Sequence, residues 1–232
     1  MTEEIDAVMF DAGGTLIDLQ PSKDFVFHKV MSEHGFRISQ KKVAEAMAHA
    51  EREFDEESAN LDGEHEDLFW DNFDRYVLDR VGFTGDGKKF AKDVSCEFEK
   101  IVPRLDSWIE FPDARPLLED LREHDFKLSV ISNATDLVRR VFDHLDLTRY
   151  FDSIIISAEV GVRKPDARIF HLSAKRANTP PNRVLYVGDK LAVDVVGAKR
   201  AGMNSILIDR ANIYPDARCI RVRTLRDLRR YL

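Results

Sequence analysis

The sequence predicts an α/β protein whose parallel β-sheet has helices on both faces and is interrupted by an all-helical insertion. Short apolar runs of strand length recur along the chain, and from the second run onward they alternate with segments of helical periodicity. Such alternation is typical of parallel sheets that are covered by helices on both sides. Between the first and second runs, by contrast, only helical periodicity is present.

The individual elements follow from these patterns. The apolar runs predict five buried strands, and the periodic segments between them predict helices with recognisable start and stop residues. Apolar residues at helical spacing also predict a packed terminal helix in 221–232. The predicted strands are 5–10, 128–131, 154–156, 184–187 and 205–208, and the predicted helices of the sheet domain are 113–124, 136–144, 166–175 and 191–201.

The insertion is recognised by apolar stripes three and four residues apart. One stripe contains Val43, Met47 and Ala50, and a second, aromatic one contains Phe69 and Phe73. We interpret the aromatic stripe as core, because stripes of this kind more often pack inside a helical bundle than line a ligand pocket. The predicted division is a sheet domain made of 1–18 and 109–232, with a helical insertion at 19–108.

Composition excludes several classes of protein. The 232 residues include 42 acidic and 35 basic ones, and the formal charge of −7 argues against nucleic acid as the main partner. Cys96 and Cys219 lie far apart and outside any metal-binding spacing, as expected of reduced thiols. Two acids precede the first apolar run, and no run is long enough to span a bilayer. We therefore expect a cytoplasmic protein without a membrane partner; the oligomeric state is not predicted.

Acidic residues follow two of the predicted strands. Asp11 comes directly after the first strand, Asp189 closes the fourth, and Asp194 lies five residues further on. Strand-end aspartates are common turn formers, so each alone is a weak signal. Ligands of parallel sheets bind at the carboxyl ends of the strands, however, and three carboxylates gathered there predict a hard cation. Gly13 and Gly14 allow a tight turn whose amides can approach an anion.

Two further segments carry groups that suit a phosphate. Ser132 closes the second predicted strand, where a hydroxyl and the amides opening the next helix can bind phosphate oxygens, although an N-cap is an equally good explanation. Lys164 lies in a loop before Pro165, and such a lysine can offset the charge between a carboxylate and a phosphate. Most loop lysines merely face water, so this signal too is weak alone.

Together and in this order, the segments VMFDAGGTLID, LSVISNATD, VGVRKPD and VLYVGDKLAVD resemble the haloacid dehalogenase-like hydrolase superfamily. The resemblance spans nearly the whole chain, and most members with this layout are phosphatases. It implies a three-layer Rossmann-like core with a helical cap inserted after the first segment. It also implies Mg²⁺-dependent hydrolysis of a small phosphorylated metabolite through an aspartyl-phosphate intermediate.

The resemblance also implies a role for each matching residue. Asp11 would be the nucleophile and Lys164 a second catalytic group. Substrate contacts would come from Gly14, Ser132, Asn133 and Lys164, and Mg²⁺ ligands from Asp11, the carbonyl of Gly13, Asp189 and Asp194.

One position departs from the pattern of the phosphatases. These enzymes usually carry an aspartate two residues after the nucleophile, which protonates the leaving oxygen, but here that position is Gly13. General acid catalysis is typically worth ~10²–10⁴-fold in rate. Phosphatase activity would then be slow, limited to good leaving groups, or assisted by another acid, for which Asp18 and His28 are candidates.

Three alternatives remain open. A 2-haloacid dehalogenase needs no acid at Gly13, but such enzymes do not normally keep the acidic pair Asp189 and Asp194. A phosphonate hydrolase tolerates a small residue there but needs a cap lysine for a Schiff base, and nothing marks the insertion's candidates as buried amines. A non-catalytic or regulatory metal- and phosphate-binding module has little reason to keep three mutually repelling carboxylates. Those candidate lysines are Lys29, Lys41 and Lys42.

Overall fold

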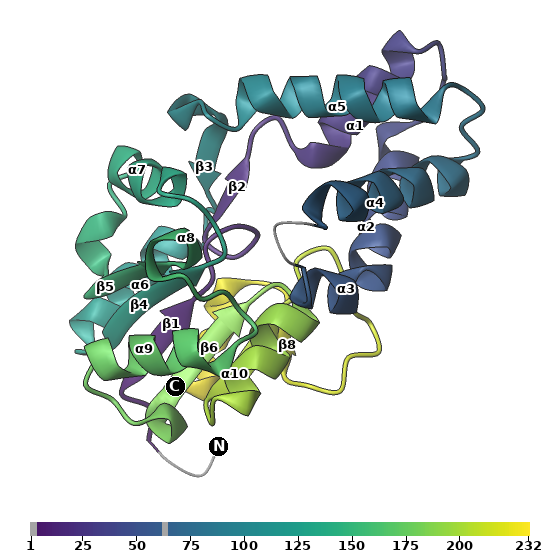
Figure 1. Ribbon diagram of the computed structural model, residues 1–232. Coiled ribbons are helices and arrows are strands. Elements are labelled where there is room, and N and C mark those ends of the chain that lie inside the picture. The colour runs from purple at the N-terminus through teal and green to yellow at the C-terminus, as the bar shows by residue number, and fades with distance from the viewer. Residues whose placement is uncertain (1–3, 62–64) are drawn as a thin grey trace. The chain divides into compact units, whose positions relative to one another are not determined.

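The computed structural model describes residues 4–61 and 65–232 (Figure 1). Residues 1–3 of the predicted sheet domain and 62–64 of the predicted insertion lie outside the described residues. The chain divides into two compact units: Met1–Asp18 with Ile109–Leu232, and Leu19–Trp108. We call them the sheet unit and the helical unit, and each is described by itself.

The sheet unit is built on six parallel strands in the order β5-β4-β1-β6-β7-β8. All five predicted strands are present, and the α/β fold class is confirmed. The sixth strand, β8, was not predicted, because it is only two residues long and pairs Arg221 and Val222 with the end of β7. The strands are β1 (Ala7–Phe10), β4 (Lys127–Ser132), β5 (Ser153–Ile156), β6 (Val184–Gly188), β7 (Asn204–Ile208) and β8 (Arg221–Val222).

The four predicted helices of the sheet unit are present with one informative difference, and the short helix α8 was not predicted. The predicted helix 191–201 begins as a wide π-helical turn, η4, in which the amide of Val195 donates to the carbonyl of Lys190, five residues back. Such turns are rare and often lie at functional sites. The α-helices are α6 (Ala114–Glu123), α7 (Leu137–His144), α8 (Ser157–Val160), α9 (Ala167–Arg176) and α10 (Gly197–Arg200), and η4 is Leu191–Val196.

Short 3₁₀ segments complete the chain. The predicted terminal helix is a 3₁₀ helix, η5, in which Leu225 and Leu228 are buried; their spacing of three residues suits three residues per turn. The other 3₁₀ segments are η1 (Leu105–Ser107), η2 (Thr148–Tyr150) and η3 (Pro181–Arg183), and η5 is Leu225–Tyr231.

Strand β1 lies in the middle of the sheet and is buried on both faces. Ala7 and Met9 point to one face, where they pack with residues of α9 and α10. Val8 and Phe10 point to the opposite face and are equally buried. Helix α6 packs against the neighbouring strand β4. The sheet is therefore covered on both sides, which explains why its strands read as continuous apolar runs.

The helical unit is a bundle of α-helices whose apolar stripes face one another. Val43 and Met47 of α2 share one buried cluster with Phe73 of α4 and Phe90 of α5. Phe54 packs edge-on against Phe69 with ring centroids 5.9 Å apart, so the aromatic stripe is core, as predicted. The helices are α1 (Lys23–Glu33), α2 (Gln40–Glu53), α3 (Asp55–Ala59), α4 (Glu66–Val81) and α5 (Gly87–Ile101).

Two short strands mark where the chain passes between the units. Strands β2 (Ile17–Leu19) and β3 (Trp108–Glu110) pair in a two-stranded sheet. The amide of Gln20 donates to the carbonyl of Ser107 at 2.8 Å, so the two ends of the helical unit meet. Neither strand was predicted, because three residues are too few for an alternating pattern to be visible.

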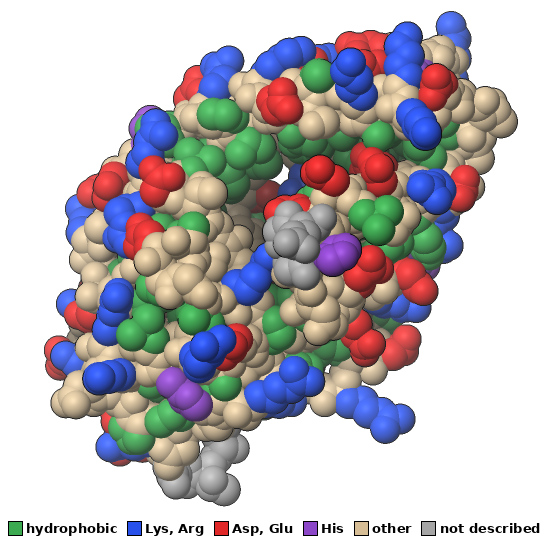
Figure 2. All heavy atoms as spheres, viewed as in Figure 1, with side chains coloured by type: hydrophobic (Ala, Val, Ile, Leu, Met, Phe, Trp, Pro, Cys, Tyr) green, Lys and Arg blue, Asp and Glu red, His purple; other side chains and the backbone are tan. Residues whose placement is uncertain are grey.

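The surface and the helices add two observations. On the face shown in Figure 2, basic and acidic side chains are interspersed rather than gathered by sign. Within residues 4–61 and 65–232, no helix combines the length and the apolar character that crossing a bilayer requires.

A buried carboxyl group in α4 predicts pH-dependent stability. Asp74 is 9% exposed, and burial, helped by the nearby charge of Asp71, raises its pKa to about 7. Below about pH 4 the carboxyl group is protonated in both the folded and the unfolded state, and it does not lower the free energy of unfolding by ionising. As the pH rises to 7 the unfolded chain ionises first, so stability falls, and above pH 7 the full cost is present.

We expect Asp74→Asn to raise the free energy of unfolding more at pH 8 than at pH 5, by on the order of 2 kcal/mol. Urea unfolding at the two pH values measures this difference. Asp79→Asn, on the exposed side of the same helix, is the control and should show no such pH dependence. Equal effects of Asp74→Asn at both pH values would contradict an elevated pKa.

Candidate active site

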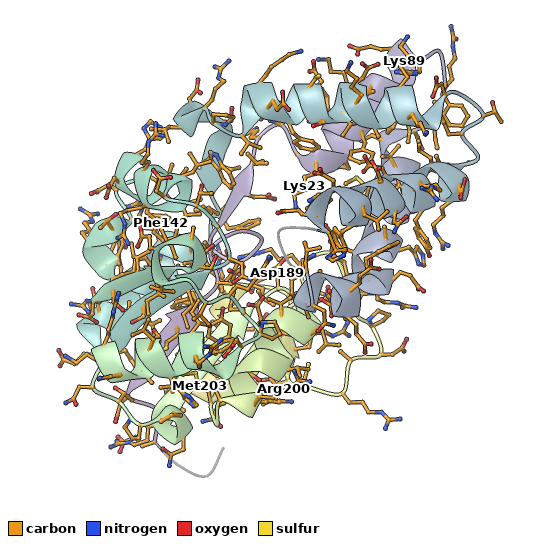
Figure 3. All side chains as sticks on the ribbon, in the orientation of Figure 1. Lys23, Lys89, Phe142, Asp189, Arg200 and Met203 are labelled. Atoms are coloured by element: carbon orange, nitrogen blue, oxygen red, sulfur yellow. The ribbon has the colours of Figure 1, made fainter. Side chains whose placement is uncertain are left out.

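The predicted site residues gather at one edge of the sheet. Asp11 follows β1, Ser132 closes β4 and Asp189 follows β6, and these three strands are neighbours in the sheet. Because the strands are parallel, their carboxyl ends lie at the same edge. Figure 3 labels Asp189, the acid at the end of β6. Lys164, in the loop between α8 and α9, reaches the same place.

Lys164 is the centre of the cluster. Its side chain is 2% exposed, and its ammonium group donates to Asp11 Oδ1 at 2.6 Å and to Asp194 Oδ1 at 2.7 Å. A third hydrogen bond, of 2.9 Å, reaches the hydroxyl oxygen of Tyr186. An ammonium group has three N–H donors and no acceptor, so all of its donors are used.

Tyr186 is a site residue that sequence reasoning missed. It lies fully buried in the middle of β6, with its ring edge-on to Phe170 at 5.0 Å. Its hydroxyl accepts from Lys164 and donates to Asp194 Oδ1 at 3.0 Å. The available signal was a tyrosine inside an otherwise apolar strand, since a buried phenol needs a hydrogen-bond partner.

Two glycines make room for the acidic pair. A Cβ atom at Gly188 would overlap the carboxylate of Asp194, and one at Gly14 would overlap that of Asp189. Gly14 also has a φ of +73°, which disfavours other residues. The carboxylate of Asp194 can thus fold back against β6, where its Oδ2 accepts from the amide of Lys190 at 3.0 Å. Gly188 was not singled out from the sequence.

Three carboxylates and one ammonium meet in the cluster. Oxygen atoms of Asp11, Asp189 and Asp194 lie within 4.8 Å of one another. Burial raises the pKa of Asp11, and the charge of Asp194 adds to this, while Lys164 opposes it. Burial works against the charge of Lys164, but the two carboxylates outweigh it and raise the pKa of the ammonium. The three carboxylates bring their oxygen atoms together, and an oxygen-ligated divalent cation fits this donor set.

The turn after β1 is held mainly by its own backbone. The amide of Asp11 donates to the carbonyl of Val187 at 2.8 Å, and the carbonyl of Ala12 accepts from Leu16. The amide of Gly14 donates to the carbonyl of Ile17 at 2.9 Å. This bond occupies the amide that we expected to approach an anion, so a substrate contact of Gly14 stays a prediction.

Gly13 lies exposed in this turn. A Cβ atom there would meet nothing within 4 Å, and its φ is outside the left-handed region. The structure therefore leaves room for a side chain at the position where related phosphatases carry their acid. The proposed role of the Gly13 carbonyl as a metal ligand stays a prediction.

Ser132 and Asn133 differ in what they offer a ligand. Ser132 is buried, and its hydroxyl makes no hydrogen bond to any residue that the structure describes, so it is available to a ligand oxygen. The side chain of Asn133 instead brackets the backbone of Lys164, accepting from its amide and donating to its carbonyl, each at 2.8 Å. Asn133 thus holds the lysine loop, and its predicted substrate contact stays a prediction.

The other candidates have simpler environments. Asp18 lies in β2, and His28 contacts the carbonyl of Ile38 through Nε2 at 2.9 Å. Lys29 forms an ion pair with Glu97. Lys41, 86% exposed, lies 3.8 Å from Glu45, and Lys42 is also exposed.

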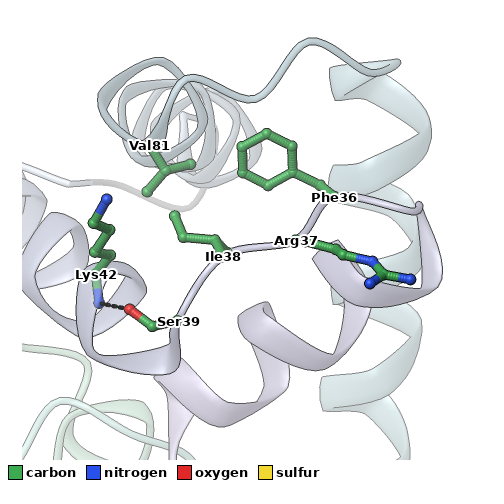
Figure 4. Close-up of a pocket in the computed structure, with 6 residues that line it drawn as sticks. All are labelled: Phe36, Arg37, Ile38, Ser39, Lys42 and Val81. Carbon is green, nitrogen blue, oxygen red and sulfur yellow. Dashed lines mark hydrogen bonds between the residues drawn. The ribbon is translucent and has the colours of Figure 1, made fainter.

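The helical unit also has a surface pocket of about 520 Å³ near the start of α2 (Figure 4). Ser39 Oγ accepts there from the amide of Lys42, which is an ordinary helix cap. The pocket is lined by Phe36, Arg37, Ile38, Ser39, Lys42 and Val81.

The fold is of the α/β type and carries an acidic cluster at the ligand-binding edge of its sheet, and comparison with known proteins identifies the family. A family model described as haloacid dehalogenase-like hydrolase matches residues 5–202. The chain therefore belongs to the haloacid dehalogenase-like hydrolase family, as its four segments indicated. The Rossmann-like core expected from the resemblance is confirmed with it.

Individual relatives point to two chemistries. A glyceraldehyde 3-phosphate phosphatase of Methanopyrus kandleri is 38% identical over 101 residues, which is 43% of this chain and 43% of that protein. The chain thus matches less than half the length of this relative. An (S)-2-haloacid dehalogenase of Burkholderia cepacia is 24% identical over 219 residues, 93% of this chain and 88% of that one.

Solved structures show the same fold. A haloacid dehalogenase-like hydrolase from Bacillus subtilis, bound to magnesium, matches with a TM-score of 0.67 and 18% identity over 99% of both chains. At this identity the likeness concerns the fold alone.

The hydrogen bonds of Lys164 predict that Tyr186 stabilises the site. In Tyr186→Phe one N–H of a buried ammonium loses its acceptor, which costs about 1–3 kcal/mol. Urea unfolding in EDTA should therefore show this loss. Tyr231→Phe is the control, because the Tyr231 hydroxyl makes no hydrogen bond within the described part of the chain. A Tyr186→Phe variant as stable as the control would mean that Lys164 does not depend on this hydroxyl.

Proposed function

We propose that the protein is a Mg²⁺-dependent phosphatase of a small phosphorylated metabolite and that Asp11 is its nucleophile. The observation that carries the proposal is the shared ammonium: Lys164 holds Asp11 and Asp194 together beside Asp189 at the ligand-binding edge of the sheet. A cytoplasmic location, and the absence of nucleic acid and membrane partners, stay predictions.

The chemistry takes two displacements at phosphorus. A carboxylate oxygen of Asp11 forms a bond to phosphorus while the ester oxygen departs and takes up a proton, leaving an aspartyl phosphate. Water then attacks phosphorus, loses a proton and releases inorganic phosphate, which restores the Asp11 carboxylate. Lys164 keeps the side chain of Asp11 in one orientation, and the available hydroxyl of Ser132 can donate to a phosphoryl oxygen.

The proposed metal ligands are Asp11, Asp189, Asp194 and the carbonyl of Gly13. When bound there, Mg²⁺ would supply positive charge beside the carboxylates and a bound phosphate. The three gathered carboxylates offer the oxygen ligands that Mg²⁺ prefers. This donor set supports a metal-dependent enzyme.

Three alternatives fit less well. The similarity to a haloacid dehalogenase covers 93% of the chain, but a dehalogenase has no use for a cation site built from Asp189 and Asp194. A phosphonate hydrolase would need a buried amine, whereas Lys29 is 43% exposed and paired with Glu97. A non-catalytic module would require the cluster to bind phosphate without turning it over.

The proposal predicts metal-dependent turnover of an activated aryl phosphate. We expect hydrolysis of p-nitrophenyl phosphate with Mg²⁺, its loss in EDTA, and a decrease on the order of 10³-fold or more in Asp11→Asn. Asp227→Asn makes the same chemical change at a surface ion pair with Arg230 and should retain activity. Turnover that survives both EDTA and Asp11→Asn would rule out the proposed mechanism.

The open space at Gly13 predicts a gain of function. Gly13→Asp should place an acid beside the leaving oxygen and raise the turnover of an alkyl phosphate by about 10²-fold or more. Hydrolysis of p-nitrophenyl phosphate should change little, because its leaving group needs no proton. Gly13→Asn, equal in size but not acidic, is the control. Equal gains for both substrates, or for both variants, would contradict the role assigned to this position.

A further inference from the structure

An Arg–Asp cluster built on Arg210 and Asp113 lies in the sheet unit, outside the carboxylate site. Arg210 follows β7, and its guanidinium donates to both carboxylate oxygens of Asp113 at 2.9 Å. The same guanidinium stacks on Phe111, 3.8 Å from the ring centroid. Asp113 also accepts from the amide of Leu225 at 2.9 Å. A planar, bidentate and stacked arginine of this kind is held in one orientation.

This cluster reaches the turn that carries Asp11. Nη2 of Arg210 donates to the carbonyl of Thr15 at 2.8 Å, and the amide of Phe111 donates to the carbonyl of Leu16 at 2.9 Å. Among the described residues, Arg210 is the only side chain that donates to the backbone of residues 12–16. The turn's other hydrogen bonds are internal or come from the backbone of Phe111.

We propose that Arg210, oriented by Asp113, is a positioning residue for the nucleophile: it fixes the carbonyl of Thr15 and thereby the turn that aims Asp11. The inference rests on the proposed function of Asp11. Asp11 is fixed on one side by the carbonyl of Val187 in the sheet, and Arg210 fixes the turn on its other side.

Positioning the nucleophile and binding the substrate affect different kinetic parameters. A displacement of a reacting group by about 1 Å can cost on the order of 10²-fold in rate. Of the predicted substrate contacts, Ser132, Asn133 and Lys164 come from other segments and make no hydrogen bond to Arg210 in the described part of the chain. Gly14 lies in the turn, but its amide is already bonded to the carbonyl of Ile17. Loss of Arg210 should therefore lower kcat and leave KM nearly unchanged.

The chain offers a matched control for the loss of a buried arginine. Arg221 donates to Asp209 and to the carbonyl of Tyr214, each at 2.9 Å. The side chains of Arg221 and Arg210 are 28% and 21% exposed, and each contacts a buried aspartate in the same unit. Arg221 makes no hydrogen bond to residues 12–16 among the described residues.

The experiment compares Arg210→Gln with Arg221→Gln in the full chain. With Mg²⁺ and p-nitrophenyl phosphate we expect kcat to fall about 10- to 100-fold in Arg210→Gln with KM within about threefold, and to stay near wild type in Arg221→Gln. Hydrogen exchange without substrate should accelerate by about tenfold or more for the amides of Gly14, Leu16 and Ile17 in Arg210→Gln only. Urea unfolding reports the loss of stability in each variant.

Two results would overturn the inference: equal losses of kcat in both variants, or unchanged exchange of the turn in Arg210→Gln. If Arg210→Gln does not fold, Arg210→Lys replaces it, because a single ammonium cannot bind both Asp113 and Thr15 in the observed way. Amide hydrogen exchange is measured without substrate and does not depend on catalytic activity. A wild-type chain that hydrolyses nothing would therefore refute the proposed function, while the exchange data would still decide whether Arg210 holds the turn.

Discussion

A single buried ammonium group makes the acidic edge of the sheet possible. Three carboxylates repel one another, and burial raises the pKa of Asp11. Lys164 offsets part of this repulsion by donating hydrogen bonds to Asp11 and Asp194, and the hydroxyl oxygen of Tyr186 accepts the third hydrogen bond of the ammonium. Because the lysine comes from the loop between α8 and α9 and the acids from β1 and the segment after β6, this contact also ties together segments far apart in the sequence. A divalent cation bound among the three carboxylates would reduce their repulsion further.

The surroundings of Asp11 show how a flexible turn can carry a precisely placed group. Glycines admit the neighbouring acids without steric overlap, as Gly14 does for Asp189 and Gly188 for Asp194. Glycine also loosens the backbone, so the turn needs support from outside itself. The sheet supplies it through the carbonyl of Val187, and the Arg210 cluster supplies it through Thr15. Glycines next to the carboxylates are thus combined with fixed hydrogen bonds to the sheet and to Arg210 further away.

Sequence patterns predicted the sheet well, because buried parallel strands are continuous apolar runs, and the polar residues at their ends include the three acids that lie together. They missed β8, whose two residues, Arg221 and Val222, are too few for a pattern. They predicted a regular helix where η4 widens, since periodicity does not register a single π-turn. Tyr186 was overlooked because its partner, Lys164, is 22 residues away along the chain. Contacts of this kind depend on the packed tertiary structure, which local patterns do not contain.

The hydrogen bond between Gln20 and Ser107 joins the two ends of the helical unit. A segment whose two ends meet is an insertion in the chain of the sheet unit. Without this insertion, a short turn would be enough to connect the chain on either side of it. Lengthening the insertion adds little to the entropic cost of bringing its ends together. Such an insertion can be exchanged, enlarged or trimmed in evolution while the strands continue to pair as before. New specificities can then arise by recombination in one part of the gene, without a redesign of the chemistry encoded in the other.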